Sequence, residues 1–381
     1  MVGSLIGAED AFALWGVLLG LAAFGFWCER RAWGVRYSGV MLVIAAAIVL
    51  SNLHLIPFAS PVYDVVWDRL VPVAIALLLL QADLGRILRE SGPTLLAFAA
   101  GAATVVAGVV LGVALLPLGQ LEAELGGIFA ATYIGGSLNF AAVSDATGAR
   151  DGALLSAAVA ADNIVTNLHF LALLALPSLA FVTRFFARDG EAGVGALAPT
   201  DDDGRHRIAA LDVPALLAAL ALAFAIVAVA EGVAALVGTP QYAVLGVTVL
   251  AVAFGTLAPG PAARLTGCNE AGNALLLIFL ATIGATAEIM AMVERAPVLF
   301  VFALVIVAVH TVGVLLIGRL LRVGLRECIV ASAACVGGPA SAVAIASARD
   351  WRDLATPAVL AGSLGYAVGS FVGVFLAGVL A

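Results

Sequence analysis

The sequence of 381 residues contains no lysine, four cysteines, four histidines and few charged residues of any kind. Charged residues make up 11% of the chain and apolar residues 63%, whereas soluble globular proteins have about 25% and about 45–50%. This composition excludes a soluble multidomain enzyme, and the apolar excess excludes a disordered chain. The formal net charge of -7 argues against nucleic acid as a partner.

Motifs of soluble enzymes and of metal sites are also missing. The cysteines form no CxxC pair and no cluster with histidine, which is typical of small apolar packing residues rather than of disulfides or zinc ligands. There is no GxxxxGK[ST] loop, no HExxH motif and no GxGxxG within a soluble βαβ unit. We therefore expect neither an enzyme nor an organic cofactor.

Long apolar runs fill most of the chain, and each is long enough to cross a bilayer as a helix. The twelve runs cover 11–28, 37–56, 66–88, 93–117, 126–147, 151–180, 211–237, 240–258, 272–293, 296–321, 326–348 and 353–379. The sequence thus predicts an all-α polytopic protein with about twelve transmembrane helices. We expect it in the inner (plasma) membrane of a bacterium or archaeon.

The two halves of the chain are related by a shift of 202 residues. The matched pairs that support this shift are Gly135/Gly337, Gly136/Gly338, Arg150/Arg352 and Asp151/Asp353. A duplicated six-span unit predicts a first repeat at 1–182, a polar linker at 183–210 and a second repeat at 211–381. Counting complete spans makes the repeats parallel, whereas the distribution of arginines favours an inverted second half.

Two glycine pairs interrupt apolar segments at corresponding positions of the halves and predict broken helices near 135–139 and 337–341. Adjacent glycines weaken a helix by about 1 kcal/mol each and proline by about 3 kcal/mol. An unwound point inside lipid must line a cavity or be buried in protein, and the half-helix that begins there favours an anionic group. The alternative is close helix packing through small residues. The candidate substrate-binding residues are Thr132, Tyr133, Gly135, Gly136, Ser137, Asn139, Gly337, Gly338, Pro339, Ser341, Ser363 and Tyr366.

A polar stripe in the sixth apolar run is the second candidate site. A carboxylate in the middle of a membrane costs several kcal/mol unless it is paired, hydrated or protonated, so it predicts a Na⁺ ligand or a proton carrier. Oxygen ligands suit a hard cation such as Na⁺ better than a transition metal. The alternative is a neutral Asp satisfied by a neighbouring helix. The candidate ion-binding residues are Asp162, Asn163, Thr166, Asn167 and, near the end of the ninth run, Glu288.

Other polar residues in the apolar runs favour structural roles. His169 and His310 are isolated in their segments and are interpreted as packing histidines whose ring nitrogens are satisfied. Asp145 near Arg150, and Glu231 near the end of the seventh run, are interpreted as solvated or paired.

Four segments together resemble the membrane proteins of domain-of-unknown-function family 819. They are TYIGGSLNFAAVSDATG (132–148), AADNIVTN (160–167), CVGGPASAVAIASARDW (335–351) and GSLGYAVGSFVG (362–373). That family is similar to the superfamily of cation–proton antiporters and anion transporters, which includes bile acid and glutamate sodium symporters. The resemblance implies inverted repeats, crossed broken helices and a mobile core that moves against a dimerising scaffold. In the antiporters an Asp-Asp or Asn-Asp pair binds the ion, and Asp162-Asn163 occupies that place in reversed order.

The sequence thus predicts a secondary active transporter that binds Na⁺ or H⁺ as its coupling ion. Its cargo is expected to be a small organic anion, moved by symport. The elevator mechanism and the homodimer follow from the resemblance alone. The alternatives are a cation–proton antiporter without organic substrate and, more remotely, a passive channel or an intramembrane enzyme.

Overall fold

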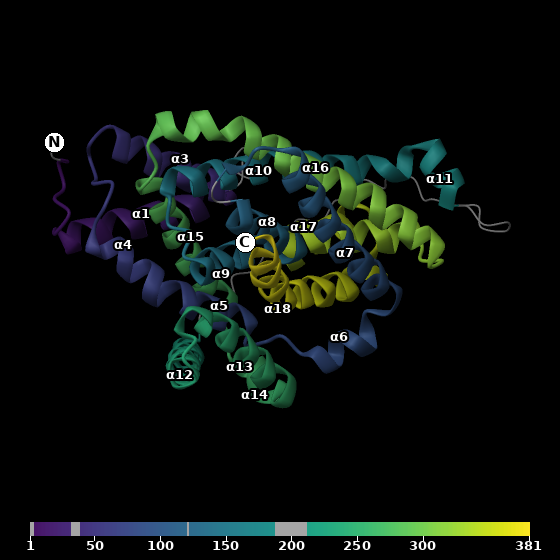
Figure 1. Cartoon of the computed structure of the whole chain (residues 1–381). Helices are drawn as coiled ribbons and strands as arrows, with labels where there is room; N and C mark the ends of the chain where they lie inside the picture. The colour runs from purple at the N-terminus through teal and green to yellow at the C-terminus, as the bar shows by residue number, and fades with distance from the viewer. Residues whose placement is uncertain (1–3, 32–38, 120–121, 187–211) are drawn as a thin grey trace.

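A computed structural model of the chain describes residues 4–31, 39–119, 122–186 and 212–381. Within these ranges the regular structure is entirely helical, and Figure 1 shows the helices packed into one elongated body. Eight of the helices are long and apolar enough to cross a membrane, or nine if one bent pair counts as a single span. This confirms the prediction of an all-α polytopic membrane protein.

The helices of the first half follow closely on one another. They are α1 (Ala11–Glu29), α3 (Gly39–Asn52), α4 (Pro61–Val65), the π-helical turn η1 (Val66–Leu70), α5 (Val71–Leu79), α6 (Leu84–Glu90), α7 (Gly92–Leu115), α8 (Glu122–Gly135), α9 (Ser137–Thr147), α10 (Gly152–Ala175) and α11 (Ala180–Phe186). Most of the predicted polar linker lies outside the described residues.

The helices of the second half follow a similar order. They are α12 (Val213–Val237), α13 (Ala243–Leu257), α14 (Pro259–Arg264), α15 (Cys268–Ala285), α16 (Ile289–Leu320), α17 (Leu325–Ala348) and α18 (Ala355–Leu380). Helix α12 begins 202 residues after α1, and α18 begins 203 residues after α10. Two of the predicted spans, those of α3 and α13, are shorter than a full crossing in the described residues.

The helices pack as two groups. Helices α7 to α10 and α16 to α18 make their most extensive contacts with one another, and we call them the core group. Helices α1, α3, α5, α12, α13 and α15 form the second set, here called the scaffold group, whose contacts with the core group are sparser. In Figure 1 the scaffold group occupies the left and lower parts of the view, α7, α17 and α18 lie towards the centre and right, and α16 runs from the upper left across to the right.

The outer helices expose apolar side chains, as expected for surfaces that face lipid. On α12 the exposed fractions are 60% for Leu217, 54% for Phe224 and 89% for Leu236. Such a continuous apolar face would promote aggregation in water, whereas it matches the hydrocarbon core of a bilayer. Helix α12 is therefore held against its neighbours by one side only.

Inside the core group, α8 and α18 approach through glycines. A Cβ atom placed on Gly135 would lie 2.2 Å from the carbonyl oxygen of Gly365, and one on Gly127 would lie 2.6 Å from that of Gly373. Both contacts are to backbone atoms, which cannot turn aside. Small residues that allow backbones to meet are a common basis of helix association in membranes.

We expect Gly135→Ala to destabilise the protein, because the added methyl group overpacks a backbone contact, at a cost of about 1–3 kcal/mol or more. Gly232→Ala on α12 is the matched control, since its added Cβ would meet no atom within 4 Å. The control should be neutral or stabilising by up to about 1 kcal/mol through helix propensity. Thermal unfolding in detergent measures both, and equal Tm values for the two variants would contradict the glycine contact.

Candidate functional site

Both glycine pairs break their helices in the same way. Gly136, between α8 and α9, has φ 84° and ψ -171°, and Gly338 inside α17 has φ 74° and ψ -166°. Residues with a side chain rarely adopt these backbone angles, so each break depends on glycine. Pro339 follows the second break and has no N–H to continue the preceding helix.

The two breaks lie against each other at the centre of the core group. A Cβ atom on Gly136 would be 3.4 Å from the carbonyl carbon of Gly337 and 3.6 Å from the nitrogen of Gly338. Helix α9 and the second half of α17 therefore both begin at this contact, which we call the crossing. The N-terminus of each half-helix has unpaired N–H groups and a partial positive charge, so the crossing favours a negatively charged group.

Helix α18 closes one side of the crossing. The side-chain amide of Asn139 is buried and donates to the carbonyl oxygen of Gly365 at 2.9 Å. Tyr366 packs against Gly338, and Gly362 packs against the backbone of Pro339. These contacts involve four of the predicted substrate-binding residues, namely Asn139, Gly338, Pro339 and Tyr366.

The hydroxyl groups predicted to bind substrate differ in whether they are free to form a hydrogen bond with it. Thr132 donates to the carbonyl of Ile128 at 2.7 Å, and Ser363 donates to that of Val359 at 2.9 Å, so both hydroxyl protons are used within their own helices. Ser137 is half-buried at the start of α9. Ser341 is also half-buried and packs against Gly337.

Asp162 is the buried carboxylate beside the crossing. It is 9% exposed on α10, and Thr166 donates to its Oδ1 at 3.0 Å. Tyr133, three residues before the break in α8, is fully buried and its hydroxyl lies near this carboxyl. That hydroxyl has no partner at full hydrogen-bond geometry within the described residues, and the nearest polar groups to it are Asp162 and Thr166.

Three of the predicted ion-binding residues do not join Asp162. The amide of Asn163 donates to the carbonyl of Val159 at 2.8 Å, and that of Asn167 donates to the carbonyl of Asn163 at 2.7 Å. Asn167 is exposed. Neighbouring positions on a helix point about 100° apart. The pair Asn163/Asn167 therefore lies on a different side of α10 from the pair Asp162/Thr166, and the two pairs do not form one polar stripe. Glu288 is exposed at the start of α16.

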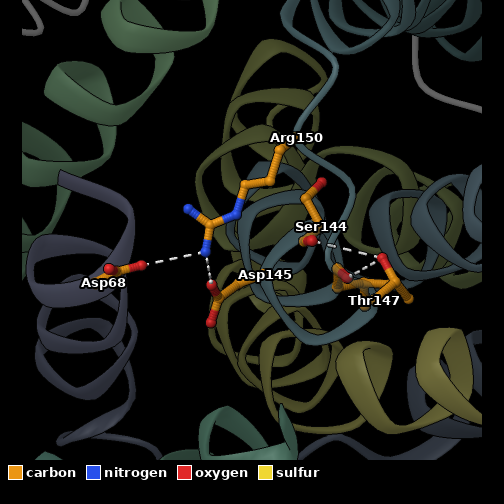
Figure 2. A network of polar contacts seen from close by, with 6 residues as sticks. Asp68, Ser144, Asp145, Thr147 and Arg150 are labelled. Atoms are coloured by element: carbon orange, nitrogen blue, oxygen red, sulfur yellow. Dashed lines mark hydrogen bonds and ion pairs between the residues drawn. The ribbon is translucent and has the colours of Figure 1, made fainter. Parts of the chain in front are cut away.

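A cleft of about 630 Å³ opens at the boundary between the core and scaffold groups. Its lining residues are Phe58, Ala59, Ser60, Asp64, Trp67, Asp68, Arg150, Gly152 and Thr286. Figure 2 shows Arg150 between two carboxylates, at 3.2 Å from Asp68 and 3.3 Å from Asp145. Its guanidinium also lies 4.4 Å from the centre of the Trp67 ring. Asp145, predicted to be solvated or paired, is paired with Arg150.

His169 and His310 are buried packing histidines with hydrogen-bond partners, as predicted, but they are not isolated from each other. Both ring Nε2 atoms lie within hydrogen-bond distance of the Ser332 hydroxyl, at 3.0 Å and 2.8 Å. The three residues come from α10, α16 and α17, so no local sequence pattern could reveal the cluster. One feature was visible: His169 lies seven residues after Asp162, two turns along the same face of the helix.

The described residues contain no group of three or more His, Cys, Asp or Glu side chains placed to hold a metal ion. The arrangement at Asp162, with one carboxylate and two hydroxyls, instead suits a proton or a hard monovalent cation.

Comparisons with known proteins agree with this membrane architecture. The family described as "Protein of unknown function (DUF819)" matches residues 16–381. The "Uncharacterized membrane protein YjcL" of Bacillus subtilis (strain 168) is 36% identical over 393 residues, which cover 98% of this chain and 98% of that protein. The similarity therefore extends over both glycine breaks and over Asp162.

At the edge of the cleft, Asp151 caps α10 outside the membrane-spanning segment. Its Oδ1 accepts from the Leu154 N–H at 3.0 Å, and its other oxygen pairs with Arg295. Burial alone would raise the pKa of Asp151, but the Leu154 N–H and the Arg295 guanidinium outweigh burial and lower this pKa below its ordinary value. The ionised carboxylate thus stabilises the fold.

We expect Asp151→Ala to cost about 0.5–2 kcal/mol, the usual value of a lost N-cap. Asp151→Asn retains a capping oxygen and should cost less. Because the pKa of Asp151 is lowered, its ionic contribution is present above the ordinary aspartate pKa of about 3.9 and is lost as pH falls below it. The Tm gap between wild type and Asp151→Asn should therefore shrink on acidification from about pH 7 to about pH 3. A gap that widens would contradict the assignment.

Proposed function

The chain belongs to the DUF819 family, and we propose that it is a secondary active transporter that couples Na⁺ or H⁺ to the movement of a small organic anion. The observation that supports this proposal best is the crossing, where two glycine breaks meet and two half-helices begin. Broken helices whose N-termini converge near the middle of a membrane protein are a recurrent way to bind an anionic substrate. Ser137 and Ser341 add half-buried hydroxyls beside the breaks.

Coupling would reside at Asp162. A buried carboxylate in an apolar helix is unfavourable when ionised, so it has a strong affinity for a proton or a cation. Its position beside Tyr133, which leads directly into the first break, supports energetic coupling between the ion and the solute. Occupation of Asp162 would then change the environment of the same helix that ends at the crossing.

Movement would follow an elevator mechanism in which the core group shifts against the scaffold group. The sparser contacts between the groups, and the cleft along their boundary, support a separable pair of bodies. The similar order and spacing of helices in the two halves support a duplicated and inverted unit, with α9 and the second half of α17 as equivalents. The proposed twelve transmembrane segments are the nine spans counted above together with α3, α13 and the broken α8–α9 pair. A homodimer through the exposed scaffold helices completes the proposal.

A second candidate is a cation–proton antiporter without organic substrate. It is favoured by the internal hydrogen bonds of Thr132 and Ser363, which leave fewer hydroxyls for a solute at the crossing. In both candidates Asp162 binds the ion. They differ in whether ion movement requires an added anion.

Proteoliposomes with a trapped pH dye, with Na⁺ uptake measured in parallel, distinguish the two candidates. A symporter should move protons or Na⁺ only when ion and solute are both supplied, so a panel of small carboxylates is tested under an imposed gradient. An antiporter should change the internal pH when Na⁺ alone is added. Ion movement that needs neither a solute nor a counter-ion gradient would contradict both and indicate a passive channel.

We expect Asp162→Asn to abolish coupled flux, lowering the rate at least about a hundredfold, because the amide cannot exchange a proton or neutralise a cation. The matched control is Asn163→Ala at the adjacent position, whose side chain bonds only to its own helix. This control should retain flux within about twofold. If Asp162→Asn transports as wild type does, the coupling role is wrong.

A further inference from the structure

A chain of hydrogen bonds joins four helices of the core group around His169 and His310. One end is the carbonyl oxygen of Gly101 on α7, 3.0 Å from the Nδ1 of His310. His310 Nε2 is 2.8 Å from the Ser332 hydroxyl, which is 3.0 Å from the Nε2 of His169. His169, Ser332 and His310 are 3%, 0% and 0% exposed.

The other end of the chain lies on α16. The Thr311 hydroxyl is 3.2 Å from the Nδ1 of His169, and it also lies 2.6 Å from the carbonyl oxygen of Val307. The chain therefore consists of five contacts, and carbonyl oxygens that can only accept stand at both ends. Every contact needs one hydrogen.

The neutral chain is one proton short. Two neutral imidazoles and two hydroxyls supply four hydrogens for the five contacts. The contacts with the end carbonyls use the Nδ1–H of His310 and the hydroxyl hydrogen of Thr311, and the Gly101 carbonyl also accepts from the Thr104 hydroxyl at 2.9 Å. The hydrogens of Ser332 and His169 then remain for the three central contacts. In one of these contacts two lone pairs therefore face each other without a hydrogen between them.

One added proton completes the chain. With the proton on His310, its Nε2–H donates to Ser332, Ser332 donates to His169, and the Nδ1–H of His169 donates to Thr311. The proton can also move: Ser332 takes the Nε2 proton of His310 and gives its own to the Nε2 of His169. A second added proton does not fit, because both rings would then donate to Ser332, whose own hydrogen would have no acceptor.

We propose that the His169–Ser332–His310 chain is a binding site for a single proton, shared by the two imidazoles and distinct from Asp162. Other titratable groups around it are few within the described residues. Cys335 of α17 packs beside Gly101 next to His310, and its thiol faces the carbonyl of Phe98. Asp162 lies two turns away on α10. The completed hydrogen bonds, rather than a neighbouring carboxylate, would stabilise the added charge.

The test uses the full chain with ¹⁵N-labelled histidine in lipid vesicles. The sequence has four histidines, so the His54→Gln/His206→Gln double variant leaves only the two rings of the site. Solid-state ¹⁵N spectra report the protonation of each ring nitrogen from about pH 8 to about pH 4, which brackets the ordinary histidine pKa of about 6.5. We expect the pair to take up one proton, with intermediate populations on both rings.

Ser332→Ala removes the bridge and should weaken proton binding at least about tenfold, a fall of about one pH unit in the midpoint. Ser370→Ala is the matched control, because Ser370 is also a buried serine, on α18, and its hydroxyl has no hydrogen-bond partner. The control should leave the midpoint unchanged. If Ser332→Ala does not fold, the number of protons that the two rings of the parent protein take up still tests the proposal.

Three results would overturn the proposal: two rings that stay neutral throughout, two rings that gain independent protons, or equal midpoints for Ser332→Ala and Ser370→Ala. The spectra contain no transport readout, so they test this site separately from the proposed transport function.

Discussion

The close contact between the two glycine breaks is the constraint on which the rest of the structure depends. Backbone polar groups inside a membrane must find partners within the protein, so an interrupted helix is stable only when other backbone surrounds it. Here Gly136 lies against Gly337, and Gly135 lies against Gly365 of α18. The contact at Gly135 leaves no room for a side chain, and at Gly136 the positive φ requires glycine, so these contacts fix α8, α17 and α18 relative to one another.

Helix α10 connects this crossing with the other buried polar groups. Asp162 lies near Tyr133 just before the first break, and the ring of Phe170 packs against Gly337 at the second. Between them His169 reaches Ser332 on α17. One helix thus contacts both broken helices through residues within three turns. The equivalent stretch of α18 has Leu364 and Gly365, so the two halves, similar in helix order, differ in their chemistry.

The sequence allowed the all-helical membrane character to be predicted, because an apolar excess has few other physical outcomes. Glycine pairs also mark Gly136 and Gly338, since only glycine adopts their backbone angles. Side-chain partners were harder to predict. The side-chain amides of Asn163 and Asn167 donate to backbone carbonyls of their own helix rather than to an ion site, and helical periodicity does not reveal this. The histidines meet through Ser332, which is 163 and 22 residues away in sequence, so their contact depends on helix packing.

The central claim is that the crossing belongs to a core group that faces each side of the membrane in turn. Labelling of Ser137→Cys with a membrane-impermeant maleimide tests this claim most directly. The native Cys28, Cys268, Cys328 and Cys335 are buried and provide an unreactive background, checked with the parent protein. We expect the introduced thiol at position 137 to be labelled in right-side-out and in inverted vesicles, at rates that shift when Na⁺ or pH changes. Labelling from one side only, under all ion conditions, would contradict it.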